Sequence, residues 1–142
     1  MKTSLEKALE VAIKAHSGQK DKAGAPYILH PIRVMMTQES NDARIIALLH
    51  DVVEDSGFSL LQLEGLGFSR KVVSAVKALT KKDGEKYENY LKRVSKNRLA
   101  ISVKLADLQD NMNLNRLKTI TEKDSQRFKK YRKAVKTLKM YL

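Results

Sequence analysis

Apolar residues recur along this chain at spacings of three and four, the period of an amphipathic helix, and no run shows the strict alternation of a strand. The first run follows the candidate N-caps Thr3 and Ser4, and its apolar face comprises Leu5, Ala8, Leu9, Ala12 and Ile13. The last begins near Thr121, which together with Asp124 resembles a variant capping box, and its apolar stripe comprises Phe128, Tyr131, Val135, Leu138 and Leu142. The pattern predicts an all-α fold.

Glycines and capping residues divide this pattern into separate helices. One helix is predicted over 41–56, with Asn41 or Asp42 as its N-cap and Gly57 as its stop. Further helices are predicted as two short segments around Gly65 and Gly67, then over 87–95, 99–112 and about 121–142. No repeat or linker divides the 142 residues, so we expect one compact domain over 1–142. Its helix at about 121–142 packs on that domain or serves oligomerisation.

The segment ALLHDVVEDS, residues 47–56, places four polar side chains in an otherwise apolar run. His50 and Glu54 are one helical turn apart, as are Asp51 and Asp55, so in a helix the four lie within roughly 140° of arc. Two interpretations are open: an exposed acidic edge of an ordinary amphipathic helix, or a site. Neighbouring carboxylates repel one another and are costly to bury without a cation, which a metal ion would supply.

Two distant positions favour the metal interpretation. Pro31 can occupy the first turn of a helix, which places His30 at the helix entrance, and Asp107 interrupts the apolar segment AISVKLADLQDNM. With His50 and Asp51 they give two imidazoles and two carboxylates, a ligand set that suits Mn²⁺, Fe²⁺, Co²⁺ or Zn²⁺ better than Ca²⁺ or Mg²⁺. Four ligands on a six-coordinate ion leave positions for water and substrate, as in metal-assisted hydrolysis.

Glu54 and Asp55 follow the predicted ligand pair by one turn. Either carboxylate could accept a proton from an attacking water or orient it. Spacing alone does not distinguish which of the two acts as the base.

The net charge of +12 predicts affinity for anions such as nucleic acid, acidic lipid or phosphorylated metabolites. Cysteine is absent, which excludes disulfides and thiolate metal sites. The N-terminus has no apolar signal-peptide core, and no run approaches the roughly 20 apolar residues of a membrane span. We therefore expect a soluble, cytoplasmic protein without a membrane partner.

Three segments in order, AHSGQKDKAGAPYILHPIRV, ALLHDVVEDS and VKLADLQDNM, resemble the hydrolase domain of RelA/SpoT-type alarmone enzymes. The pattern H…HD…D is that of HD-domain metal-dependent phosphohydrolases, and the likeness is greatest to the small stand-alone alarmone hydrolases of the metazoan Mesh1 type. This resemblance implies an all-α HD fold, one Mn²⁺ ion, or another divalent transition metal, and removal of the 3′-pyrophosphate of (p)ppGpp.

The resemblance also implies residue roles. The metal ligands of the family fall on His30, His50, Asp51 and Asp107, and its catalytic Glu-Asp pair falls on Glu54 and Asp55. Its ribose-contacting asparagine falls on Asn111. Lys20 and Lys22 lie in the loop where the family places basic residues that contact the nucleotide.

The chain departs from the family at three positions. Asp21 stands where the family has a basic residue, which is unfavourable beside a pyrophosphate unless the carboxylate points away or pairs with Lys20 or Lys22. Leu108 and Asp110 replace a basic residue and a histidine. These changes leave adenine alarmones and the 2′-phosphate of NADPH open as alternative substrates.

A different class of function has less support. The charge and the basic last helix would also suit a nucleic-acid-binding protein with a degenerate HD site, but no nucleic-acid-reading motif and no tryptophan occur. The intact ligand set argues against it. The apolar stripe from Phe128 to Leu142 docks within the chain or, alternatively, pairs two copies as a homo-oligomer.

Overall fold

The computed structural model describes residues 1–142, apart from the side chain of Leu114. The helices are α1 (Ser4–Ala15), α2 (Leu29–Met36), α3 (Asn41–Leu49), α4 (Val52–Asp55), α5 (Leu60–Gly65), α6 (Arg70–Leu79), α7 (Tyr87–Ser95), α8 (Arg98–Asn111) and α9 (Glu122–Lys139), with a 3-10 turn at Leu114–Arg116. Extended pairing in the described part of the chain is an isolated antiparallel bridge between Lys20 and Pro26. The all-α prediction is confirmed.

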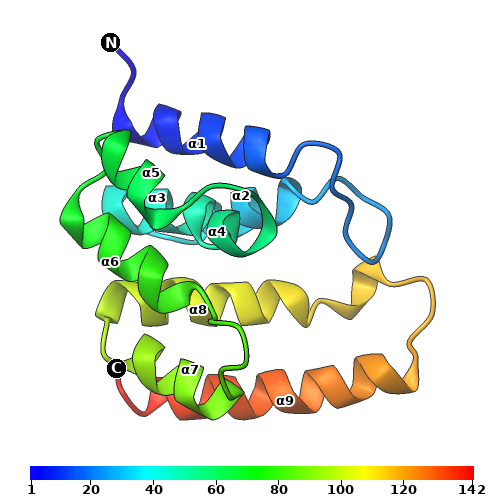
Figure 1. Ribbon diagram of the computed structural model, residues 1–142. Helices are drawn as coiled ribbons and strands as arrows, with labels where there is room; N and C mark the ends of the chain where they lie inside the picture. Colours follow the sequence, from blue (N-terminus) through cyan, green and yellow to red (C-terminus); the bar gives the residue numbers. More distant parts are fainter.

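The helices are stacked in layers, and α2, α3 and α4 lie between α1 and α8 (Figure 1). Helix α1 covers α2, α3 and α4 on one side, and α8 lies on the other. Helix α9 returns antiparallel to α8 and packs against α8 and α7. The loop after α1 and the segment between α8 and α9 lie at the same end of the molecule, so residues far apart in sequence meet there (Figure 1).

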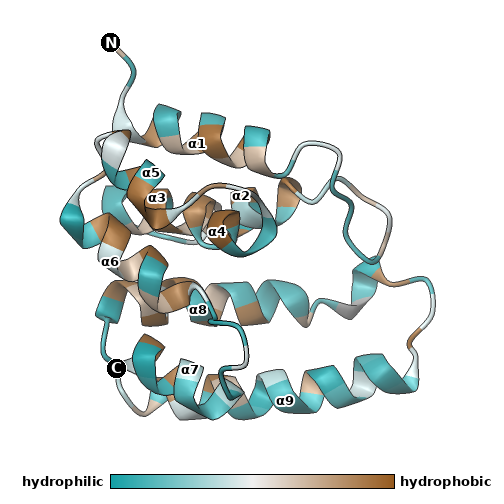
Figure 2. Ribbon diagram, viewed as in Figure 1, coloured by the Kyte–Doolittle hydropathy of each residue, from teal (hydrophilic) through white to brown (hydrophobic). Residues whose placement is uncertain are grey.

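Helix α3 is the centre of the core. It packs against α1, α2, α6 and α8, and the six consecutive residues Ile45 to His50, the last of which belongs to the site, are buried. In Figure 2 the hydrophobic colouring is concentrated on α3, α4 and the neighbouring part of α8, whereas α9 is mostly hydrophilic. Burial of this apolar surface is the main stabilising contribution to the fold. Within the described residues, no helix combines the length and the apolar character needed to cross a membrane.

The predicted caps are largely confirmed. Thr3 caps α1 and forms a capping box with Glu6, and Thr121 does the same for α9 with Asp124. Helix α3 differs from the prediction, because its N-cap is Ser40, whose hydroxyl accepts the Ala43 N–H at 3.1 Å.

The prediction of one helix over 41–56 is wrong. Helix α3 ends at Leu49, a turn follows at His50 and Asp51, and α4 is a separate single turn. The Nδ1 of His50 lies 2.5 Å from the carbonyl oxygen of Ala47, the group that would accept the Asp51 N–H in a continuous helix. The histidine side chain thus takes over the backbone acceptor at the point where the helix breaks.

Arg93 of α7 connects α6 to the loop that follows it. Its guanidinium donates to the carbonyl oxygens of Lys77 at 3.1 Å and Thr80 at 2.8 Å, and it forms a two-pronged ion pair with Glu85 at 2.8 Å. The same loop bears Lys81, whose backbone N–H donates to Glu54. Arg93 therefore stabilises a loop that also positions a predicted catalytic side chain.

Replacing Glu85 by glutamine should make stability less dependent on pH. The hydrogen bond from Arg93 lowers the pKa of Glu85 to about 2, below its ordinary value of 4.5. The ion pair therefore stabilises the fold above about pH 4.5, and this contribution is lost as the pH falls toward 2. Urea titrations should show Glu85→Gln less stable than the wild type at neutral pH, with the difference shrinking in acid.

Glu88→Gln, which removes the same charge from an exposed position of α7, is the control and should leave the free energy of unfolding nearly unchanged. A Glu85→Gln deficit that stays constant from neutral to acidic pH would contradict the assignment.

Candidate metal centre

Four side chains predicted as metal ligands converge in the interior. His30 comes from the first turn of α2, His50 and Asp51 from the turn between α3 and α4, and Asp107 from α8. One donor atom from each lies within 4.8 Å of all the others. Oδ1 of Asp107 is 2.8 Å from Nε2 of His30 and 3.3 Å from Nε2 of His50. The structure brings together residues that are up to 77 positions apart in sequence.

The break in the helix produces the geometry of the His50-Asp51 pair. Adjacent residues of a continuous helix diverge by about 100° around its axis. In the turn, by contrast, Oδ2 of Asp51 lies 3.0 Å from Nε2 of His50, and Tyr27 donates a hydrogen bond to the same oxygen. Both donors of the doublet can therefore face one point.

Both histidines direct Nε2 into the cluster because Nδ1 is already engaged. Nδ1 of His30 lies 2.6 Å from Oδ2 of Asp110, and Nδ1 of His50 bonds the carbonyl oxygen of Ala47. A proton held on Nδ1 by a carboxylate or carbonyl leaves Nε2 free for a cation, the usual arrangement around metal-bound histidines. The donor set and its surroundings thus fit a divalent metal ion.

The charges of the cluster depend strongly on one another. Burial opposes charging of His30 and His50, but nearby carboxylates outweigh it, so the pKa of each ring is raised. Burial would likewise raise the pKa of Asp107, yet Lys104 and the two histidines hold it well below its ordinary range. The carboxylates are therefore ionised, and a bound cation would replace protons now shared with the rings.

Glu54 and Asp55 lie on α4, directly after the cluster. Partial enclosure by protein raises the pKa of Glu54, and the charge of Asp51 adds to the effect. Partial enclosure and Asp51 raise the pKa of Asp55 in the same way. Nε2 of Gln19 donates to Asp55 at 3.2 Å, and Oε1 of Gln19 lies 2.8 Å from Nδ1 of the buried His16. A chain of polar contacts thus orients one of the two acids.

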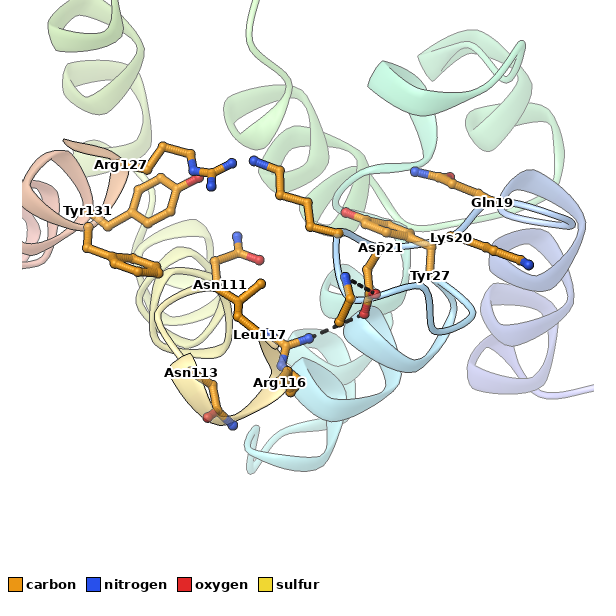
Figure 3. A pocket seen from close by; sticks show the side chains of 13 residues that line it. Gln19, Lys20, Asp21, Tyr27, Asn111, Asn113, Arg116, Leu117, Arg127 and Tyr131 are labelled. Carbon is orange, nitrogen blue, oxygen red and sulfur yellow. Dashed lines mark hydrogen bonds and ion pairs between the residues drawn. The ribbon is translucent and has the colours of Figure 1, made fainter. Parts of the chain in front are cut away.

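A cavity of about 270 Å³ adjoins the cluster (Figure 3). Tyr27, which bonds Asp51, and Asn111, which donates to Oδ1 of Asp107 at 3.2 Å, both line it. The remaining lining residues are mainly basic or aromatic: Gln19, Lys20, Asp21, Lys22, Ala23, Asn113, Arg116, Leu117, Arg127, Phe128 and Tyr131. All three residues predicted to bind substrate are therefore in the lining, although the Lys20 side chain extends away from Asn111 and Arg127 in Figure 3.

Asp21 has a structural use within its own loop. Its Oδ1 accepts the backbone N–H groups of Ala23 at 2.9 Å and Ala25 at 3.0 Å, and its Oδ2 lies 3.6 Å from Nη1 of Arg116. Its cationic partner is thus Arg116, where the sequence suggested Lys20 or Lys22. Figure 3 shows this contact across the lower side of the cavity.

Leu108 and Asp110, the other two departures from the family pattern, also fit their surroundings. Leu108 is fully buried in the core. Asp110 accepts two hydrogen bonds from Arg33, at 2.8 and 3.0 Å, in addition to its contact with His30. Burial opposes ionisation of Asp110, but His30 and Arg33 lower the pKa of its carboxyl far below the ordinary range.

We did not predict from the sequence that Tyr27, Lys104 and Asp110 contact the metal-ligand cluster. Lys104 and Asp110 each lie three residues from Asp107 on α8, and a search for helical neighbours of each ligand would have found both. Tyr27 belongs to a loop, so no periodicity marks it.

The fold and the cluster define an all-helical protein with a largely buried two-histidine, two-aspartate centre. No family model matches the chain. It is 32% identical over 120 residues to guanosine-3′,5′-bis(diphosphate) 3′-pyrophosphohydrolase of Aquifex aeolicus, and 34% identical over 123 residues to the bifunctional (p)ppGpp synthase/hydrolase SpoT of Escherichia coli. A GTP pyrophosphokinase of Streptomyces coelicolor is 37% identical over 125 residues. These matches take in 76–79% of this chain but only 15–17% of the length of the curated relatives.

The fold has a solved counterpart of similar size. The structure, described as a metazoan ortholog of SpoT that hydrolyzes ppGpp and plays a role in starvation responses, superposes with a TM-score of 0.79 at 25% identity. The likeness covers 97% of this chain and 86% of the other. The resemblance inferred from the three motifs is confirmed: the chain is a relative of the RelA/SpoT-type alarmone hydrolases and has their HD-domain fold.

Metal binding should stabilise the protein, and Asp51→Ala should remove most of that effect. A ligand at 100 times its dissociation constant adds about 2.7 kcal/mol to the free energy of unfolding. We expect Mn²⁺ to raise the melting temperature of the wild type and to leave Asp51→Ala nearly unchanged in differential scanning fluorimetry.

The matched control is Asp83→Ala, which removes an exposed carboxylate from the loop after α6 and should keep the full metal response. An equal rise in melting temperature for Asp51→Ala would place the metal elsewhere.

Proposed function

We propose that this chain hydrolyses the 3′-pyrophosphate of guanosine 3′,5′-bis(diphosphate) and its triphosphate form, giving GDP or GTP and pyrophosphate. The observation that carries the proposal is the His/Asp cluster at the edge of a basic cavity. Support comes also from the relatives named as 3′-pyrophosphohydrolases and from the structural neighbour described as hydrolysing ppGpp.

His30, His50, Asp51 and Asp107 would hold the metal ion, for which we propose Mn²⁺. When bound, such an ion supplies Lewis acidity toward a phosphoryl oxygen and favours ionisation of water at neutral pH. Glu54 and Asp55 act on the attacking water: one accepts a proton from this water, and the other orients the water. Their raised pKa values make them stronger bases than free carboxylates.

The cavity supplies complementary groups for the rest of a nucleotide. Lys22 and Arg127 provide positive charge for phosphates, and Tyr131 offers a ring against which a base can stack. Asn111 uses its amide N–H toward Asp107, which leaves its carbonyl oxygen to accept a ribose hydroxyl.

Hydrolysis should depend on the metal and on the Glu-Asp pair. With Mn²⁺ the wild type should release pyrophosphate from ppGpp. Glu54→Gln and Asp55→Asn should both lower kcat, and the variant that removes the general base should lower it by about 10²- to 10⁴-fold. Pyrophosphate and orthophosphate should be measured separately, and both variants should retain the Mn²⁺-induced rise in melting temperature.

The same assay on ppApp and NADPH tests the alternative substrates. Orthophosphate release from NADPH with no reaction of ppGpp would reassign the substrate while keeping the metal centre. A metal-loaded protein inactive on all three nucleotides would overturn the proposal.

Removing the charge of Lys22 should weaken substrate binding. A charge-assisted hydrogen bond to phosphate contributes roughly 1.5–3 kcal/mol, so Lys22→Ala should raise KM by about 10- to 150-fold with a smaller change in kcat. Lys96→Ala, an exposed lysine after α7, is the control and should keep both parameters. An unchanged KM for Lys22→Ala would place the phosphates elsewhere in the cavity.

A further inference from the structure

Lys104 is a buried charged side chain that contacts a predicted metal ligand directly and has no role in the proposed reaction. It lies on α8 one turn before Asp107, and its side chain is only 14% exposed. Its Nζ is 2.9 Å from Oδ2 of Asp107. A buried ammonium is costly unless it is paired, so losing the contact with Asp107 would be strongly unfavourable.

The two oxygens of Asp107 have separate partners. Oδ1 faces the interior of the cluster, where it lies 2.8 Å from Nε2 of His30 and accepts the amide N–H of Asn111 at 3.2 Å. Oδ2 is directed to Lys104. In this arrangement Oδ1 of Asp107 can bind a cation in the cluster, whereas Oδ2 is occupied by Lys104.

Tyr90 of α7 holds the ammonium in place. The Nζ of Lys104 lies 5.3 Å from the centroid of the Tyr90 ring, a cation–π distance. The ring itself is fixed, since Tyr90 is buried and its hydroxyl donates to the carbonyl oxygen of Leu79 at 2.9 Å. Lys104 therefore has both an anionic and an aromatic partner, and both partners are buried.

We propose that Lys104 is a positioning residue that restricts Asp107 to one-oxygen ligation of the metal ion. Three further ligands come from His30, His50 and Asp51, so one-oxygen binding by both aspartates leaves about two of six positions for water and substrate. Without Lys104, Oδ2 of Asp107 is free to bind as well, and one of those positions is lost. The inference rests on the proposed metal centre but not on the identity of the nucleotide.

The number of exchangeable waters on bound Mn²⁺ tests this directly, by the field dependence of water-proton relaxation. The wild type should retain about two waters, as expected for four protein donors on a six-coordinate ion. Lys104→Met keeps the length and apolar stem of the side chain without the ammonium, and it should retain about one water. Mn²⁺ affinity, from isothermal titration calorimetry, should be equal or tighter, because a positive charge is removed and a donor gained.

Lys104→Arg retains the charge and a donor and should restore the second water. Lys92→Met, the same change on the exposed side of α7, controls for the loss of a lysine and should match the wild type. Equal water numbers in Lys104→Met and the wild type would overturn the proposal. A purely structural role would lower the melting temperature and weaken Mn²⁺ binding with no change in waters per bound ion.

If Lys104→Met does not fold, the wild type still tests the one-oxygen ligation, because one water or none on bound Mn²⁺ contradicts it. Failure of ppGpp hydrolysis would leave this measurement untouched, so the two proposals can fail separately.

Discussion

The rest of the site depends on the contacts that the Asp107 carboxylate makes with His30, His50 and Lys104. This carboxylate joins α8 to α2 through His30 and to the end of α3 through His50, and its second oxygen bonds Lys104. Each of these groups would be unfavourable in the interior alone, because a buried charge without a partner costs several kcal/mol. Together they form a network that stabilises the ionised carboxylate and holds three helices in register.

The interruption between α3 and α4 serves the same network. A continuous helix would have turned His50 and Asp51 to different sides of its axis. The bond from the His50 ring to the Ala47 carbonyl oxygen coincides with the break and leaves Nε2 directed inward. Chemistry at this position therefore depends on a local departure from the regular structure that the surrounding aliphatic residues favour.

Two acids at positions where the chain departs from the family pattern are paired with arginines of the same chain. Asp21 and Asp110 introduce two acids near a cavity suited to phosphates, and Arg116 lies between them, 3.6 Å from one carboxylate and 3.5 Å from the other. Asp110 also orients His30. Asp21, which was unfavourable from the sequence, and Asp110 are thus both paired with cationic side chains of this chain.

The sequence by itself determined the helical class, most helix boundaries and the four converging residues. Amphipathic periodicity, caps such as Thr121 and costly acids such as Asp51 are local signals of backbone preference and burial. Only the tertiary structure decided which oxygen faces which partner. The pairing of Asp21 with Arg116 and of Lys104 with Tyr90 joins side chains of different elements, whose approach depends on packing across the whole domain.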